Sequence, residues 1–195
     1  VTGLTHDERG YPVTTDLAVQ ERLVHRLIEK IRAHRADIIR VESDGLDDAE
    51  VIVVAYGISA RVAQWPIEMA RAEGIKVGLL KLVTVWPFAE DLIRQLAGRV
   101  KAFVVPEINY GQIALEVERC AGGQARTIHV PHAGGDIHEP RVVLEAIRQA
   151  NQINRLEHGL HFPSEVRRVV RAHSETDECA HVAENSIPNG RPELA

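Results

Sequence analysis

The chain has 195 residues, of which 45% are hydrophobic and 26% charged, and its net charge is −5. This composition is ordinary for a globular protein, and the negative charge gives no reason to expect a general affinity for nucleic acid. No apolar run approaches the roughly 20 residues that span a membrane, and the polar first residues predict no signal peptide. The two cysteines, Cys120 and Cys179, form neither a disulfide framework nor a CxxC site, which favours a reducing, cytoplasmic setting.

The first twelve residues, VTGLTHDERGYP, are predicted to be irregular because glycine and proline interrupt them. They contain four consecutive polar side chains, Thr5, His6, Asp7 and Glu8. A histidine beside two carboxylates can act as an acid or base with a raised pKa. A solvated linker explains the same residues and is the simpler interpretation.

Residues 14–35 are predicted to form an amphipathic helix. Thr15 or Asp16 can cap it, and an apolar stripe at three- and four-residue spacing must pack on something; the stripe consists of Leu23, Leu27, Ile28 and Ile31. An extended piece is expected at 37–41. The acidic, turn-rich stretch at 42–50, ESDGLDDAE, predicts a boundary between a linker segment, 1–44, and a domain at 45–150.

Strands and helices alternate through this domain. The predicted strands are 51–56, 76–82, 102–105 and 126–130, and the predicted helices are 60–73, 89–96, one beginning at 112, and 140–149. Pro66 should kink the first of these helices or delay its start. Continuous apolar strands joined by helices indicate a three-layer α/β/α fold with a mostly parallel sheet.

The segment after the third strand is the first candidate site. The strand is expected to break at Pro106 and enter a polar turn before the next helix starts at Gln112. In open parallel sheets, ligands and partner domains dock at this edge. Asn109, Tyr110, Gly111 and Gln112 are therefore interface candidates, although a plain connection with a permissive glycine and a capping asparagine explains them equally well.

The second candidate lies around the last strand and loop. His129, His132 and His138 surround Gly134 and Gly135, and histidine is a zinc ligand. No HExxH sequence is present and the cysteines lack metal spacing, so we predict no metal site: His129 packs in or near the strand, and the other two solvate a loop. The paired glycines before a helix can instead take an anion on their free amide groups.

Other features bound the interpretation. A second histidine pair, His158 and His161, lies in the segment 151–195. That segment is expected to form at most a short helix at 165–172, and to drape over a partner surface or be partly disordered. No GxGxxG, Walker A or GxSxG sequence is present. Because the chain starts at Val1 and its one methionine is Met69, we expect it to be a piece of a longer polypeptide.

Five motifs occur in order between residues 1 and 150: VTGLTHDERGYP, VIVVAYG, GIKVGLLKLVTVWPF, PEINYGQIALEVER and GGDIHEP. Together they resemble the alpha subunit of 2-oxoacid:ferredoxin oxidoreductases, especially the 2-oxoglutarate type. The resemblance implies a domain like the C-terminal domain of transketolase, preceded by a linker helix. The C-terminal extension at 151–195 lies outside the resemblance. These enzymes convert a 2-oxoacid and coenzyme A to acyl-CoA, carbon dioxide and reduced ferredoxin, and use thiamine diphosphate, Mg²⁺ and iron–sulfur clusters.

The resemblance also implies a division of labour. A pyrimidine-binding part of the alpha subunit would precede Val1, and a beta subunit would hold the diphosphate and the cluster cysteines. This chain is then expected to be non-catalytic, to bind no cofactor by itself and to make subunit contacts. The segment from Thr2 to Glu8 would lie nearest the active-site side, and the loop from Asn109 to Gln112 next. The alternative is a free-standing α/β module that binds an anionic ligand or a metal.

Overall fold

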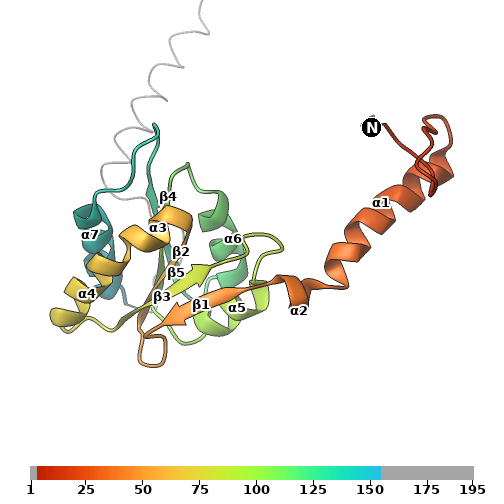
Figure 1. The fold of residues 1–195 in the computed structure, drawn as a ribbon. Helices are drawn as coiled ribbons and strands as arrows, with labels where there is room; N and C mark the ends of the chain where they lie inside the picture. Colours follow the sequence, from red (N-terminus) through yellow and green to blue (C-terminus); the bar gives the residue numbers. More distant parts are fainter. Residues whose placement is uncertain (1–3, 155–195) are drawn as a thin grey trace, which may run out of the picture.

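The computed structural model describes residues 4–154. Its centre is a five-stranded sheet in the order β1-β3-β2-β4-β5 (Figure 1). The strands are β1 (Val41–Asp44), β2 (Val51–Tyr56), β3 (Val77–Leu82), β4 (Ala102–Glu107) and β5 (Arg126–Pro131). β1 pairs antiparallel with β3, and the other three pairings are parallel. The predicted, mostly parallel sheet is confirmed.

Helices cover both faces of the sheet. They are α3 (Gly57–Val62), α4 (Gln64–Ala72), α5 (Glu90–Ala97), α6 (Gln112–Ala121) and α7 (Pro140–Asn151). Alternate residues of β2 point to opposite faces: Val53 joins the core under α3, α4 and α7, whereas Ile52 joins the core under α5 and α6. The central strands are buried on both sides, as their continuous apolar sequences predict. The three-layer arrangement is therefore also confirmed.

Two local features differ from or refine the sequence expectation. The 60–73 helix is two helices that meet at Ala63, with Pro66 in the first turn of α4, where a missing N–H costs little. The predicted strand ended at residue 105, but β4 is longer. It continues through Pro106, which lies opposite Val130, to Glu107. The ladder between β2 and β4 stops at Val104, so the proline lies beyond it and interrupts no bond to β2.

The secondary structure of the segment before β2 also differs in part from the expectation. Residues Arg35–Ile38 form a short helix, α2, rather than an extended piece, and β1 joins the sheet although it lies before the predicted boundary at 44/45. β1 is an edge strand with exposed polar side chains, and Glu42 pairs with Lys81 of β3 at 2.8 Å. Charged side chains are common on edge strands, so this strand looked like a turn in the sequence.

Helix α1 (Leu17–Arg32) stands away from the sheet and its helices (Figure 1). The Asp16 carboxylate caps it by accepting from the backbone N–H groups of Ala18 and Val19, at 2.9 and 3.3 Å. At the base of this arm, the Thr84 hydroxyl donates to the Ile38 carbonyl at 2.8 Å. No helix between residues 4 and 154 is long and apolar enough to cross a membrane. The predicted helix at 165–172 lies outside the described residues.

Candidate functional site: the carboxyl edge of the sheet

The four parallel strands end at one edge of the sheet, which we call the carboxyl edge. Tyr56 ends β2, Glu107 ends β4 and Pro131 ends β5. Two of the candidate segments follow these strands, the loop at 108–112 and the glycine loop at 132–139. The topology thus places both at the edge where parallel sheets bind ligands or partners.

Glu107 is the most deeply buried charged group in the described part of the chain, with an exposed fraction of 0%. Its carboxylate lies at the first turn of α6. Oε1 accepts from the N–H of Ile113 at 2.9 Å, and Oε2 accepts from the N–H of Ala114 at 2.8 Å. The Tyr56 hydroxyl and the Asn109 amide each donate to Oε1 at 3.2 Å. The charge is stabilised by donors and by the positive end of the helix dipole.

Asn109 holds the loop in a second way. Its Oδ1 accepts from the N–H groups of Gly111 at 2.7 Å and Gln112 at 3.1 Å. These bonds satisfy backbone donors at the start of α6, which otherwise lack partners. The capping role that the sequence suggested for Asn109 is therefore real, and Glu107 extends it into the helix.

Gly111 is required by its surroundings. Its φ of 110° lies in the region that favours glycine, and a Cβ placed on it would come 3.2 Å from the ring of His129. Burial lowers the pKa of His129 and outweighs the charge of Glu107, whose Oε2 is 4.0 Å from the imidazole Nε2. A neutral imidazole thus packs beneath the loop, in agreement with the prediction that His129 lies in the strand.

The side chains that the loop presents to solvent are different. Tyr110 is 76% exposed, and Gln112 is also exposed. Neither side chain is needed for the hydrogen bonds that hold the loop. A rigid turn that displays a bare aromatic ring suits contact with another protein surface better than it suits acid–base chemistry.

The N-terminal candidates lie elsewhere. Asp7 Oδ1 accepts from the N–H groups of Arg9 and Tyr11, at 2.9 and 3.0 Å, within a turn closed by a bridge between His6 and Pro12. The Thr5 hydroxyl bonds Gln20 on α1. A cavity of about 400 Å³ opens here, lined by His6, Asp7, Glu8, Arg9, Val19, Arg22, Leu23 and Arg26. This group sits on the outer end of the arm and is not brought to the carboxyl edge (Figure 1).

The glycine loop is open. Gly134 and Gly135 have φ values of 103° and 82°, and no atom lies within 4 Å of a Cβ placed on either. The sequence led us to expect that His138 solvates this loop, and that prediction is wrong. His138 is 3% exposed, and its Nε2 bonds the Val130 carbonyl at 2.9 Å. Burial lowers its pKa against the effect of that bond. Its ring centroid lies 5.3 Å from that of His132. Anion binding by the glycines stays a prediction.

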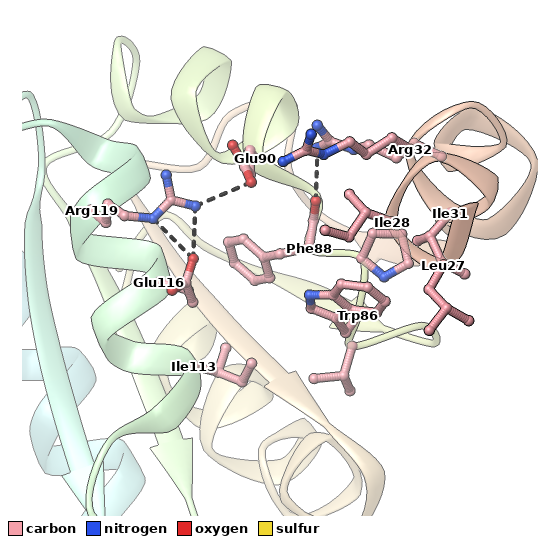
Figure 2. Close-up of a pocket in the computed structure, with 13 residues that line it drawn as sticks. Leu27, Ile28, Ile31, Arg32, Trp86, Phe88, Glu90, Ile113, Glu116 and Arg119 are labelled. Carbon is pink, nitrogen blue, oxygen red and sulfur yellow. Dashed lines mark hydrogen bonds and ion pairs between the residues drawn. The ribbon is translucent and has the colours of Figure 1, made fainter. Parts of the chain in front are cut away.

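A larger cavity of about 620 Å³, which we call the arm groove, lies between α1 and the sheet domain. Figure 2 shows Leu27, Ile28 and Ile31 on one wall and Ile113, Glu116 and Arg119 on the other, with Trp86 and Phe88 between them. Arg119 bonds Glu116 at 2.7 Å and Glu90 at 3.1 Å. This groove was not predicted from the sequence, because its walls come from segments far apart in the chain.

The described residues can be tested for the side chains that would bind a metal ion or an iron–sulfur cluster. Between residues 4 and 154 no group of three or more His, Cys, Asp or Glu side chains could hold a metal ion. The cysteine in this range, Cys120, is buried on α6, whereas a four-iron cluster takes four cysteine ligands. Glu107 is already surrounded by N–H and O–H donors. The residues between 4 and 154 therefore do not supply the ligands of a four-iron cluster.

The sequence analysis did not identify Glu107 or Tyr56 as residues of this site. Glu107 was placed in a polar turn, and Tyr56 was treated as the last residue of a strand. The available signal was an acidic residue directly after a buried strand and six residues before the first apolar position of a helix. Such a carboxylate can reach the free N–H groups of that helix.

Comparison with known proteins identifies the domain. Residues 49–143 match the family described as pyruvate:ferredoxin oxidoreductase core domain II. They form a core domain II of the 2-oxoacid:ferredoxin oxidoreductase family. Over 147 residues the chain is 44% identical to 2-oxoglutarate synthase subunit KorA of Methanothermobacter marburgensis, a match that covers 75% of this chain and 39% of that protein.

Two further matches agree with this assignment. The chain is 44% identical over 123 residues to ketoisovalerate oxidoreductase subunit VorB of Methanothermobacter thermautotrophicus, covering 63% of this chain and 35% of that protein. The 2-oxoglutarate:ferredoxin oxidoreductase of Magnetococcus marinus shares the fold, with a TM-score of 0.64 at 23% identity over 77% of this chain and 26% of that chain. The chain thus spans about two fifths of the length of the first curated relatives it matches. The alpha-subunit family that the motifs predicted is confirmed.

Proposed function

We propose that this core domain II is the non-catalytic, structural and subunit-contact domain of a thiamine diphosphate-dependent 2-oxoglutarate:ferredoxin oxidoreductase. The observation that carries the proposal is the 44% identity over 147 residues to a 2-oxoglutarate synthase subunit. The complex would convert a 2-oxoacid and coenzyme A to acyl-CoA and carbon dioxide, and would pass two electrons to ferredoxin. The ketoisovalerate oxidoreductase subunit matches over a shorter span, 123 residues against 147, which favours 2-oxoglutarate as the substrate.

The carboxyl edge supports a contact role. Glu107 is fully engaged in holding α6 and the 108–112 loop, so it has no free oxygen with which to take a proton from a substrate. The side chain of Tyr110, on the turn before α6, is exposed to solvent at this edge. The chemistry is then assigned to the partners: a pyrimidine-binding part of the alpha subunit and a beta subunit, which would hold thiamine diphosphate, Mg²⁺ and iron–sulfur clusters. A cytoplasmic setting is part of the same proposal.

The test is a reconstitution of the alpha subunit that contains this chain with its beta subunit, followed by assays of coenzyme A-dependent ferredoxin reduction. We expect turnover by the complex, fastest with 2-oxoglutarate among 2-oxoglutarate, pyruvate and 3-methyl-2-oxobutanoate, and none by the 195-residue chain alone. Turnover by the isolated chain would refute the non-catalytic assignment. A complex that prefers another of these acids would refute the substrate assignment only.

The contact role has its own test. Tyr110→Arg should reduce the amount of beta subunit that co-purifies with the alpha subunit, because a charge would enter an apolar contact. Leu115→Arg is the matched control: Leu115 lies on α6, is 58% exposed, and does not line the loop or the arm groove. Equal recovery of the beta subunit with both variants would count against the 108–112 loop as the contact.

A further inference from the structure

Apolar side chains form an exposed row on the outer side of α3 and α4, which we call the α3–α4 stripe. Ile58 is 42% exposed, Trp65 44% and Met69 38%, and Val62 among them is partly buried. Spacings of three and four residues place these four side chains on one side of a helix. Exposed apolar side chains that gather in one patch mark a binding surface, whereas scattered ones do not.

The stripe is continuous because α3 runs into α4 almost without a break. The Ala63 N–H donates to the Ser59 carbonyl at 3.0 Å, and the Ile67 N–H donates to the Ala63 carbonyl at 3.1 Å, both with helical spacing. The charged residues that border the stripe are Arg61 and Glu68, both exposed. Because the border carries one charge of each sign, it does not select a strongly charged partner. An apolar occupant fits this surface best.

The described part of the chain ends beside this surface. Ile153 packs against the core that α3, α4 and α7 cover. At the end of α7, Arg148 Nε donates to the carboxylate of Glu73, the residue that follows α4, at 2.9 Å. The extension at 155–195 therefore continues from the end of the domain at which α4 also ends.

The extension has an apolar row of its own. The sequence predicts a short helix at 165–172, capped by Ser164, with Val166, Val169 and Val170 on one side. So short a helix is not stable in water unless that side is packed. The stretch 155–163 that leads to it spans up to roughly 30 Å when extended, and the α3–α4 stripe is about 17 Å long. The predicted helix is therefore within reach of the stripe.

We propose that residues 165–172 dock as a helix on the α3–α4 stripe of the same chain. The side that carries Val166, Val169 and Val170 lies against Trp65 and Met69, so one contact buries both apolar surfaces. The tether gives the segment a high effective concentration at the stripe, so a small interface suffices. The extension lies outside the matched core domain, residues 49–143, and the contact is an addition to that domain.

The first experiment measures the fluorescence of Trp65 in the full 195-residue chain. Trp86→Phe removes the other of the two tryptophans, so that the emission comes from Trp65. In this background, Val169→Glu should raise the acrylamide quenching constant by roughly twofold, because a charge in an apolar contact releases the segment. Val182→Glu is the matched control, since it adds the same charge to the extension outside the predicted helix. Equal quenching in the two variants overturns the proposal.

The reciprocal change is made on the stripe and measured in the extension. Met69→Glu should speed trypsin cleavage after Arg167 and Arg168 by roughly tenfold or more, because an undocked segment is open to the protease. Val142→Glu is the matched control: Val142 on α7 is 44% exposed and does not belong to the stripe. Circular dichroism checks that both variants fold. Cleavage at one rate in both variants would contradict the docking.

The reconstituted complex distinguishes this occupant from a partner subunit. Hydroxyl-radical oxidation of Met69, read by mass spectrometry, should be slow in the alpha subunit alone, and Val169→Glu should speed it. Protection that appears only when the beta subunit is added, and that Val169→Glu leaves unchanged, would show that the beta subunit covers the stripe and would overturn the proposal. These measurements follow a contact within one chain and no turnover, so they can fail while the proposed enzymatic function stands.

Discussion

At the scale of single residues, Glu107 is the side chain on which the carboxyl edge depends. It brings together the end of β4, the start of α6, Tyr56 and Asn109. In Glu107→Gln, one carboxylate oxygen becomes an NH₂ group that faces backbone donors. We expect the free energy of unfolding to fall by about 2 kcal/mol, the usual cost of disrupting a charge-assisted hydrogen bond at a buried site. Urea denaturation of the variant measures this loss.

The control for this substitution is Glu68→Gln, because Glu68 is exposed on α4. It should change the unfolding midpoint little. If the two variants unfold at the same urea concentration with the same slope, then the carboxylate of Glu107 does not hold the loop and helix together as described.

The buried imidazoles make a prediction about pH. Burial lowers the pKa of both His129 and His138 in the folded protein, so below pH 6.5 the unfolded chain binds more protons than the folded one. The stability that these groups contribute is complete above pH 6.5 and is lost as pH falls through that value toward the folded pKa. Each group contributes at most about 1.4 kcal/mol per pH unit.

We therefore expect the free energy of unfolding to decrease between pH 7.5 and 5.5, and His129→Gln to flatten that decrease. Urea titrations at each pH provide the measurement. A variant whose slope with pH equals that of the unsubstituted chain would show that protonation of His129 does not limit stability in acid.

At the scale of elements, the turn between β4 and α6 is held by close packing as well as by hydrogen bonds. Gly111→Ala must adopt a positive φ and also place its Cβ 3.2 Å from the His129 ring. Gly134→Ala meets the same backbone strain, at φ 103°, but has open space around its Cβ. We expect Gly111→Ala to lose about 2–3 kcal/mol of stability and Gly134→Ala about 1 kcal/mol.

Thermal or urea unfolding of the two alanine variants separates the two effects. Both variants have the backbone strain of a positive φ, and only Gly111→Ala also has the close contact with the His129 ring. Equal losses would mean that the ring of His129 moves aside without cost. The turn would then be specified by its backbone alone.

At the scale of the whole molecule, the chain has a packed α/β domain and an arm that adds little to it. Phe103 of β4 is fully buried beneath α5 and α6, whereas Leu27 on the arm is 46% exposed. We expect Phe103→Ala to lower the free energy of unfolding by about 3–5 kcal/mol and Leu27→Ala to change it by less than about 0.5 kcal/mol in the monomer.

This comparison is made by urea unfolding in dilute protein, so that association does not contribute. A large loss in Leu27→Ala under those conditions would mean that α1 packs on the domain of its own chain.

The sequence by itself determined most of the fold. The apolar runs at β2, β3, β4 and β5 and the helical periods between them predicted the three-layer order, because burial on both faces leaves a strand no polar positions. The ordered motifs predicted the family. Asp16 as the cap of α1 and Asn109 as the cap of the turn were also visible, since capping acts between residues close in sequence.

The tertiary structure decided what depends on residues far apart in the chain. The charged side chains of β1 did not predict a strand, and only its antiparallel pairing with β3 identifies it as an edge strand. The environment of Glu107 includes the hydroxyl of Tyr56, which lies 51 residues away in the sequence and donates to the carboxylate at the first turn of α6. The arm groove joins α1, the loop at 85–88 and α6. Periodicity and capping act over a few residues and can be read from a sequence, whereas the burial of a charge and the shape of a groove exist only once distant segments have packed together.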